Sequence, residues 1–200
     1  LRDLALMGGY LYIAMAGARQ IWRLDTATHE IEPYAGSGQD GLVDGPLDKA
    51  AFVEPSGIVT DGEVLYVADS GASAIRRIKR GMVETFIGRS PDDFGDLDTI
   101  ARMARIHHSK GIAYHEGLIY LADTCNHKIK EFDPATGWVL TRVGSGSRGY
   151  QDGLSGDARL DEPDGLVNFS GLWYITDTGN NIIRVYDPVR HVVSTLRLWG

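Results

Sequence analysis

Histidine and cysteine side chains that could hold a metal ion gather in one stretch of the sequence, at His107, His108, Cys125 and His127. Imidazole nitrogen and thiolate sulfur are zinc ligands, and Cys125 and His127 are only two positions apart. A zinc site needs three or four ligands converging at about 2.0–2.3 Å, and Cys125 is the only cysteine of the chain. We therefore expect no cofactor, with a metal ion at these four residues as the alternative. Packed or surface histidines and a small buried thiol are the structural interpretation.

Three aspartates at the ends of apolar runs could form a second kind of site. Asp69, Asp123 and Asp177 follow one another at intervals of 54 residues, each directly after a run that predicts a strand. A carboxylate in this place can accept N–H groups of the loop that follows, so we interpret the three as structural loop aspartates. The alternative is a ring that binds calcium or a polar ligand, which Met15 interrupts at the corresponding place near the amino terminus.

Other polar residues lie between the apolar runs, where loops would present them to a ligand. Binding residues are commonly carried on loops that a rigid scaffold positions. Together with residues already mentioned, the ligand-face candidates are Arg19, His107, His108, Asp123, Cys125, His127, Arg148 and Asn181.

A short basic run could contact phosphate groups. It consists of Arg76, Arg77, Lys79 and Arg80. The corresponding places elsewhere carry Arg23, Lys128, Lys130 and Arg184. Because these form no continuous basic stripe, we interpret the run as the solvated face of a strand and its turn. The formal net charge of −7 argues against a general nucleic-acid binder, so RNA binding is the weaker alternative.

No familiar catalytic arrangement stands out in the sequence. We find no Ser/His/Asp spacing, no paired-carboxylate signature and no phosphate loop, since the Gly36-Ser37-Gly38 stretch lacks the lysine and the helix that such a loop requires. We therefore assign no catalytic residues, and we lean towards no enzymatic activity for this chain alone.

The elements that must position these residues follow from an internal repeat of 54 residues. The positions in step are Tyr12, Tyr66, Tyr120 and Tyr174, then Ile21, Ile75, Ile129 and Ile183, and also Gly57, Gly111 and Gly165. A period near 50 residues is typical of propellers and solenoids. Four copies in register therefore predict a repeat architecture.

Each copy contains four short apolar runs separated by turn residues, which predicts four strands. In the second copy these are Gly57–Thr60, Val64–Ala68, Ala74–Ile78 and Val83–Ile87. The last strand of the fourth copy is predicted over Val192–Leu198. Four-stranded antiparallel units repeated along a chain are the blades of a β-propeller, so the fold class is all-β. The blades cover approximately 1–36, 55–88, 109–144 and 163–200, joined by long loops within a single domain over 1–200.

Composition is that of a globular protein without an obvious membrane segment. Hydrophobic residues make up 43% and charged residues 24%, and no apolar run reaches the length of a membrane span. We therefore expect no membrane partner. A single cysteine permits no intrachain disulfide, which fits a reducing compartment and favours the cytoplasm.

Two stretches carry a resemblance to a known family. The run from Pro55 to Ser70 and the run from Ile119 to Ile129 resemble the NHL repeat. That family usually forms six-bladed propellers, so the resemblance implies that the four blades belong to a larger ring. The stretch from Ile13 to Trp22 looks like the NHL portion of proteins that also contain a thioredoxin-like domain. The resemblance implies that this domain and further blades precede Leu1.

The expected function is that of a non-enzymatic interaction or scaffold module in a thioredoxin-like and NHL-repeat protein. It would bind a protein or a small ligand at the loop face over the channel, and self-association through open blade edges is a further expectation. The alternative from another class is a metal-assisted lyase or hydrolase, because related six-bladed propellers include such enzymes.

Overall fold

The structure, a computed structural model, describes residues 1–197. Regular structure in this range is almost entirely antiparallel β-sheet, in four sheets of four or five strands. Short 3₁₀ turns are the helical segments among the described residues, and none of these has the length and apolar character needed to cross a membrane. The predicted all-β fold of four antiparallel blades is confirmed. The number of blades in a complete ring stays a prediction.

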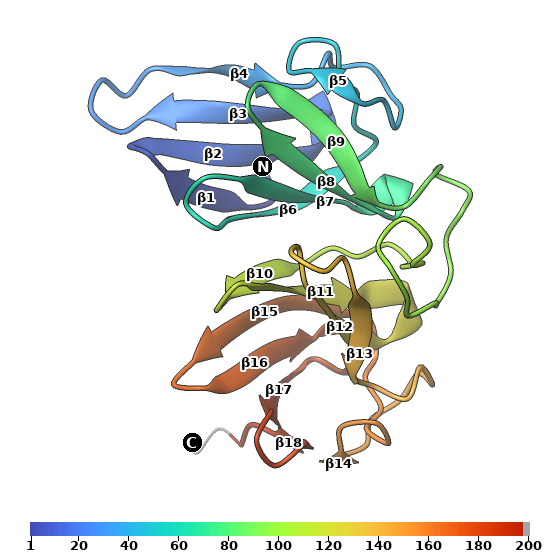
Figure 1. Ribbon diagram of the computed structural model, residues 1–200. Helices are drawn as coiled ribbons and strands as arrows, with labels where there is room; N and C mark the ends of the chain where they lie inside the picture. Colours follow the sequence, from blue (N-terminus) through green and yellow to red (C-terminus); the bar gives the residue numbers. More distant parts are fainter. Residues whose placement is uncertain (198–200) are drawn as a thin grey trace. The chain divides into compact units, whose positions relative to one another are not determined.

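The chain divides into two compact units, each with two blades. The first unit comprises residues 1–97 and 101–108, and the second comprises 98–100 and 109–200. Each unit is described by itself below (Figure 1).

The first unit contains blades 1 and 2, whose third strands follow a 3₁₀ turn. Blade 1 consists of β1 (Leu4–Met7), β2 (Tyr10–Met15), η1 (Ala16–Ala18), β3 (Gln20–Asp25) and β4 (Ile31–Ala35). Blade 2 consists of β5 (Gly45–Pro46), β6 (Pro55–Thr60), β7 (Leu65–Asp69), η2 (Ser70–Ala72), β8 (Ala74–Lys79) and β9 (Met82–Ile87). The four strands predicted for this copy are confirmed to within two residues.

The second unit contains blades 3 and 4 with the same order of elements. Blade 3 consists of β10 (Ile112–His115), β11 (Leu118–Asp123), η3 (Thr124–Asn126), β12 (Lys128–Phe132) and β13 (Val139–Val143). Blade 4 consists of β14 (Gly153–Leu154), β15 (Pro163–Phe169), β16 (Leu172–Asp177), η4 (Thr178–Asn180), β17 (Ile182–Asp187) and β18 (Val192–Thr195). The predicted last strand is longer than β18, and its final residue, Leu198, lies outside the described residues.

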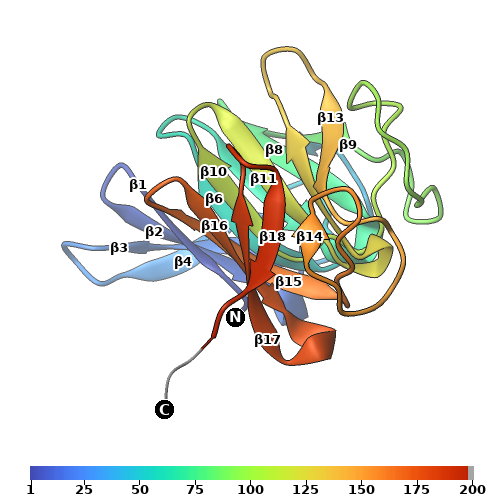
Figure 2. The same cartoon turned by 90° about the horizontal axis from the view of Figure 1, so that it is seen from below.

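Blades 2 and 4 each gain a fifth strand that the sequence did not predict. β5 pairs with β9, and β14 pairs with β18 (Figure 2). The connections that precede blades 2 and 4 thus each add a strand to the outer edge of that blade. Each added strand is only two residues long and begins with glycine. Because neither carries an apolar run, hydrophobic patterning has no signal for them.

The core of each unit lies between its two blades. Buried apolar residues of both blades and of the connection between them form one cluster in each unit. In the first unit the cluster includes Tyr12, Ala14, Ile21, Ala50, Phe52, Ile58, Leu65, Val67, Ile78 and Val83. In the second it includes Tyr120, Ala122, Ile129, Ala158, Leu160, Trp173, Ile175, Tyr186 and Val193. The same repeat positions therefore build both cores.

Candidate functional site

Four equivalent turns present different side chains on one backbone frame. The residue that closes each 3₁₀ turn has a left-handed backbone with φ between 48° and 56°, and its N–H donates to the carbonyl of the first turn residue at 3.0–3.1 Å. These residues are Arg19, Ser73, His127 and Asn181. Three of the predicted ligand-face residues thus occupy one structural position. It lies at the end of a blade that carries the 3₁₀ turn and the connections, which we call the turn end.

The frame behind the turns is a buried cluster of charges that recurs in blades 2, 3 and 4. Each cluster joins an aspartate at the end of the second strand, a basic residue in the third strand, and an aspartate from the connection. The three clusters are Asp69–Arg76–Asp44, Asp123–Lys130–Asp98 and Asp177–Arg184–Asp152. The first two members of each are completely buried. Burying a charge is costly unless it is paired and hydrogen-bonded, so each cluster fixes its loops to its sheet.

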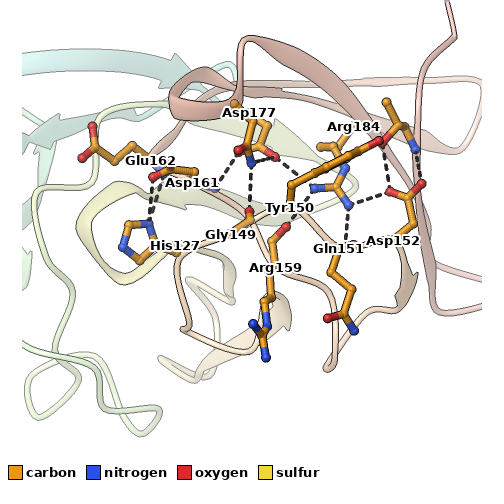
Figure 3. Close-up of polar contacts among 12 residues, drawn as sticks. His127, Gly149, Tyr150, Gln151, Asp152, Arg159, Asp161, Glu162, Asp177 and Arg184 are labelled. Atoms are coloured by element: carbon orange, nitrogen blue, oxygen red, sulfur yellow. Dashed lines mark hydrogen bonds and ion pairs between the residues drawn. The ribbon is translucent and has the colours of Figure 1, made fainter.

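Blade 4 shows how the cluster holds the connection in place (Figure 3). Asp177 Oδ2 lies 3.0 Å from Arg184 Nη1, and Arg184 Nη2 donates to Asp152 Oδ1 at 2.7 Å. The guanidinium also donates to the carbonyls of Gln151 and Arg159, at 2.7 and 2.9 Å. One arginine therefore ties two separate parts of the connection to the third strand.

The loop aspartates hold backbone N–H groups, but on a different side from the predicted one. Asp69 accepts N–H groups from Val53 and Glu54, and Asp177 accepts the N–H of Asp161 at 2.6 Å. These donors precede the first strand of the same blade, whereas the prediction placed them in the loop after the second strand. Because the first and second strands are antiparallel neighbours, the start of one lies beside the end of the other.

The interpretation of the basic run as a solvated face is wrong for Arg76. Its side chain is completely buried, and so are those of Lys130 and Arg184 at the same repeat position. In blades 2 and 3 the register of the third strand shifts directly before this residue, and such a bulge re-aims the side chain. The sequence does contain a signal for these clusters. The basic residues recur every 54 residues, and so do three aspartates of the connections, Asp44, Asp98 and Asp152.

Blade 1 has no such cluster. Met15 stands where the other blades have aspartate, and Trp22 stands where they have the basic residue. Trp22 instead donates its indole N–H to Gln20 at 3.0 Å. The turn residue of this blade, Arg19, pairs with Asp40 of the connection, with 3.3 Å between Nη2 and Oδ2.

A polar site forms at the turn end of the second unit, where His127, Arg148, Asp161 and Glu162 come together (Figure 3 labels all but Arg148). Glu162 donates its N–H to His127 Nδ1 at 3.1 Å, so the neutral ring carries its proton on Nε2. Arg148 Nε lies 2.9 Å from Asp161 Oδ1, and His127 Nδ1 lies 3.8 Å from the same oxygen. The other three residues lie 21 to 35 positions after His127 in the sequence. Their spacing alone does not reveal that they meet.

Asp161 is the least satisfied member of the polar site. Its side chain is only 8% exposed, and Arg148 approaches its Oδ1 without hydrogen-bond geometry, so this oxygen accepts no hydrogen bond from the described residues. A buried acceptor without a donor raises the free energy of the folded state. The guanidinium of Arg148 is two-thirds exposed, whereas Asp161 Oδ1 is buried, so the group that the site offers to solvent is the cation.

Cys125 lies next to the charge cluster of blade 3, and it lacks the features of an activated thiol. It occupies the middle of η3, a position that is glycine in the other three repeats, and it is exposed. Partial burial of its sulfur and the negative charges of Glu162 and Asp123 raise the pKa of the thiol, while Lys110 opposes the rise. A raised pKa lowers the fraction of thiolate, which is the reactive form of the side chain.

The two adjacent histidines lie in the first unit, where they contact other loop residues of that unit. The ring of His107 stacks on Phe94 with 4.4 Å between centroids, and His108 donates its N–H to Ser73 Oγ at 3.1 Å. Burial, with a smaller effect of His108, lowers the pKa of His107, which favours its neutral ring. In residues 1–197 no group of three or more His, Cys, Asp or Glu side chains is placed to hold a metal ion.

The remaining candidates belong to blades 3 and 4. Asp123 accepts Ser109 Oγ at 3.1 Å and Asn126 Nδ2 at 2.8 Å, both within the turn end of blade 3. Asn181 closes η4 and lines a pocket on blade 4 with Thr176 and Ile183. The structure therefore unites His127 and Arg148 in one site and leaves Asn181 beside a different feature.

Comparison with known proteins places these features in context. No family model matches the sequence. The chain is 36% identical over 212 residues to NHL repeat-containing protein 2 of Bos taurus, covering 92% of this chain and 29% of that protein. It is 35% identical over 190 residues to the chloroplastic protein SUPPRESSOR OF QUENCHING 1 of Arabidopsis thaliana, covering 88% of this chain and 18% of that protein. The chain thus spans less than a third of the length of these relatives.

Solved structures share the fold at lower identity. A structural genomics protein of unknown function from Bacteroides thetaiotaomicron superposes with a TM-score of 0.76 at 20% identity, covering 96% of this chain and 47% of that one. At this identity the likeness shows the fold alone.

Proposed function

The chain is an NHL-repeat β-propeller segment, and we propose that it acts as a non-enzymatic interaction module which binds a protein or a small ligand at the turn end of its blades. The observation that carries the proposal is the contrast between a constant frame and variable side chains. The buried charge clusters recur in three blades, while the closing residue of each turn changes from arginine to serine, histidine and asparagine. A rigid scaffold with variable loop residues is the usual arrangement of a binding surface.

The polar site of the second unit supplies the chemistry of recognition. Asp161 Oδ1 lacks a hydrogen-bond donor, and Arg148 extends an exposed guanidinium next to it. A ligand with an anionic or carbonyl oxygen can accept hydrogen bonds from the exposed guanidinium of Arg148, which Asp161 holds in place. His127 Nε2 is a further donor at the edge of the site, because Nδ1 is already engaged.

The thiol chemistry supports a binding role for this chain alone. Cys125 has a raised pKa and no second cysteine in the sequence, so it is poorly suited to thiol exchange. We place redox chemistry instead in a thioredoxin-like domain of the parent protein, as the resemblance of the first repeat implies. In that arrangement the propeller orients substrates for the redox domain.

Affinity capture tests the binding role. The purified chain serves as bait in an extract of the source organism, and captured molecules are identified by mass spectrometry and titrated individually. We expect a partner that binds the Arg148→Ala and Asp161→Asn variants at least about tenfold more weakly than the wild type, which corresponds to about 1.4 kcal/mol. Arg190→Ala is the matched control, since Arg190 is exposed at the opposite end of blade 4.

Two results would contradict the proposal. One is a partner whose affinity is equal for the wild type and both site variants, because the turn end would then be irrelevant to binding. The other is turnover of a small substrate by the purified chain with no bound partner at any concentration tested.

A further inference from the structure

A polar pocket of about 450 Å³ lies on blade 2 in the first unit. Its lining residues come from β9 and from the connections before and after the blade, and they are Asp44, Thr85, Gly88, Arg89 and Arg102. Both connections lie wholly within the described residues, so complete segments of the chain form its walls. The volume is in the range of sites that bind small molecules, about 300–1,000 Å³.

Two arginines of this pocket lack a carboxylate partner. Neither Arg89 nor Arg102 forms an ion pair within residues 1–197, although the net charge of the chain is −7 and most of its other arginines are paired. Arg89 donates its Nε–H to the backbone carbonyl of Arg102 at 2.8 Å, which ties the two ends of the connection together. Both side chains are exposed, so their terminal nitrogens are accessible to a ligand.

The two arginines occupy positions that carry no cation in the other connections. A glycine with φ between 96° and 103° follows the last strand of blades 1, 2 and 3. The next residue is Ser37 after blade 1, Ser145 after blade 3 and Arg89 after blade 2. At the repeat interval of 54, position 102 corresponds to Asp48 and Gly156. The shared frame therefore requires a cation at neither position, and both cations are specific to this connection.

Asp44 offers a hydrogen-bond acceptor at the same pocket. Its Oδ1 accepts Arg76 Nη2 at 3.0 Å and Thr85 Oγ1 at 2.7 Å. In blades 3 and 4 the second oxygen of the equivalent aspartate accepts the N–H of a threonine, Thr141 or Thr195. Asp44 Oδ2 accepts no hydrogen bond from the described residues, and the side chain is 51% exposed. Blade 2 thus leaves an accessible acceptor where blades 3 and 4 use theirs internally.

We propose that this pocket binds a small molecule that carries a phosphate group and a hydroxyl group. The phosphate oxygens accept hydrogen bonds from Arg89 and Arg102, and the hydroxyl donates to Asp44 Oδ2. A dianionic phosphate matches the charge of two guanidinium groups, whereas a carboxylate matches only one. Arg76 offsets the charge of Asp44, so the carboxylate does not cancel the two free cations. The pocket shares no residue with the polar site around Asp161, so neither proposal depends on the other.

Titration of the full chain with glycerol 3-phosphate tests the proposal, because this probe carries one phosphate and two hydroxyl groups. Isothermal titration calorimetry is run in chloride buffer at about pH 8, where the phosphate is dianionic, since its second pKa is about 6. We expect saturable binding that Arg89→Ala and Arg102→Ala each weaken about tenfold to a hundredfold, because a hydrogen bond between charged groups is lost. n-Propyl phosphate, which has no hydroxyl, and glycerate, which has a carboxylate for the phosphate, should each bind about tenfold more weakly.

Arg80→Ala is the matched control, because Arg80 is an exposed arginine of the same unit that lies between β8 and β9 and does not line the pocket. It should bind the probe as the wild type does, and circular dichroism checks that all variants are folded. Absence of saturable binding up to about 10 mM probe, or equal affinity of the wild type and both pocket variants, overturns the proposal. Equal affinity for glycerol 3-phosphate and either analogue overturns the assigned ligand class. Binding that Arg148→Ala abolishes and Arg89→Ala preserves assigns the phosphate to the polar site and also overturns it.

Discussion

Asp177 and Arg184 form an ion pair in which both side chains are completely buried, with 3.0 Å between Oδ2 and Nη1. The pair joins the ends of adjacent antiparallel strands and, through further bonds of the guanidinium, the connection that precedes the blade. Its equivalents in blades 2 and 3 do the same with Arg76 and Lys130. The turn end of a blade is thus held by a charge inside the sheet and not by contacts between exposed loops.

Removing the cation should be strongly destabilising. Arg184→Met leaves Asp177 as a buried carboxylate without its charged partner, and breaking one side of a buried pair costs about 3–5 kcal/mol. Urea denaturation measures the loss in the free energy of unfolding. Arg190→Met, an exposed arginine of the same blade, should change it by no more than about 0.5 kcal/mol. Equal stability of the two variants would show that the pair is dispensable.

Acid should weaken blade 3 through Asp98. Burial raises the pKa of this carboxyl, but the bond from Lys130 and the N–H of Thr141 outweigh burial and hold the pKa below its usual range. A lowered folded-state pKa means that Asp98 stabilises the fold above its unfolded pKa of about 3.9, and that this contribution disappears as the pH falls through the folded value. Between pH 7 and pH 2, Asp98→Asn should therefore lose less of its unfolding free energy than the wild type. An identical slope in both proteins would exclude the contribution.

The glycine of the turn in blade 4 should not tolerate a side chain. A Cβ at Gly179 would lie 2.4 Å from Asp161 Cγ, whereas a Cβ at Gly17, the same turn position in blade 1, would meet no atom within 4 Å. Gly179→Ala is expected to cost about 1–3 kcal/mol of unfolding free energy because the turn must shift. Gly17→Ala should be neutral or stabilise by up to about 1 kcal/mol through the unfolded chain. Thermal melts of the two variants compare them directly, and equal melting temperatures would contradict the steric explanation.

The side chain of His127 should be replaceable by serine more easily than by alanine. At the equivalent left-handed position, Ser73 Oγ accepts the N–H of His108 at 3.1 Å, as His127 Nδ1 accepts that of Glu162. His127→Ser can restore the acceptor, so it should be more stable than His127→Ala by about 1 kcal/mol. Backbone strain is shared by both variants and cancels in the comparison. Amide exchange at Glu162 provides a local readout, and faster exchange in the serine variant than in the alanine variant would refute the prediction.

The repeat reveals the blades because their strands depend on apolar residues that recur at a fixed interval. Leu65–Asp69 is buried on both faces, as an apolar run without alternation predicts. The residues of the charge clusters recur at the same interval. Arg76 is nevertheless predicted to be solvated, because it lies in a basic run whose other members, such as Arg77 and Lys79, are only partly buried. Burial of an arginine depends on partners that the folded connection supplies, and local composition does not report them.

The polar site is less visible still. Arg148 and Asp161 meet because the connection turns back on itself, and the equivalent pair in the preceding repeat is Phe94 with His107. A stacked pair of rings and an ion pair share no residue type, so no pattern search would align them. Only the path of the backbone shows that the two pairs occupy one place.

The way the blade edges are covered bears on the colloidal behaviour of the protein. An outer strand with unpaired N–H and C=O groups is a template for fibril growth. Here β5 and β14 pair with the outer strands of blades 2 and 4, Pro33 interrupts the donor row of β4, and Ile100 bridges to Trp138 just before β13. Four outer edges are thus blocked in three different ways, so the described chain should resist amyloid formation at high concentration.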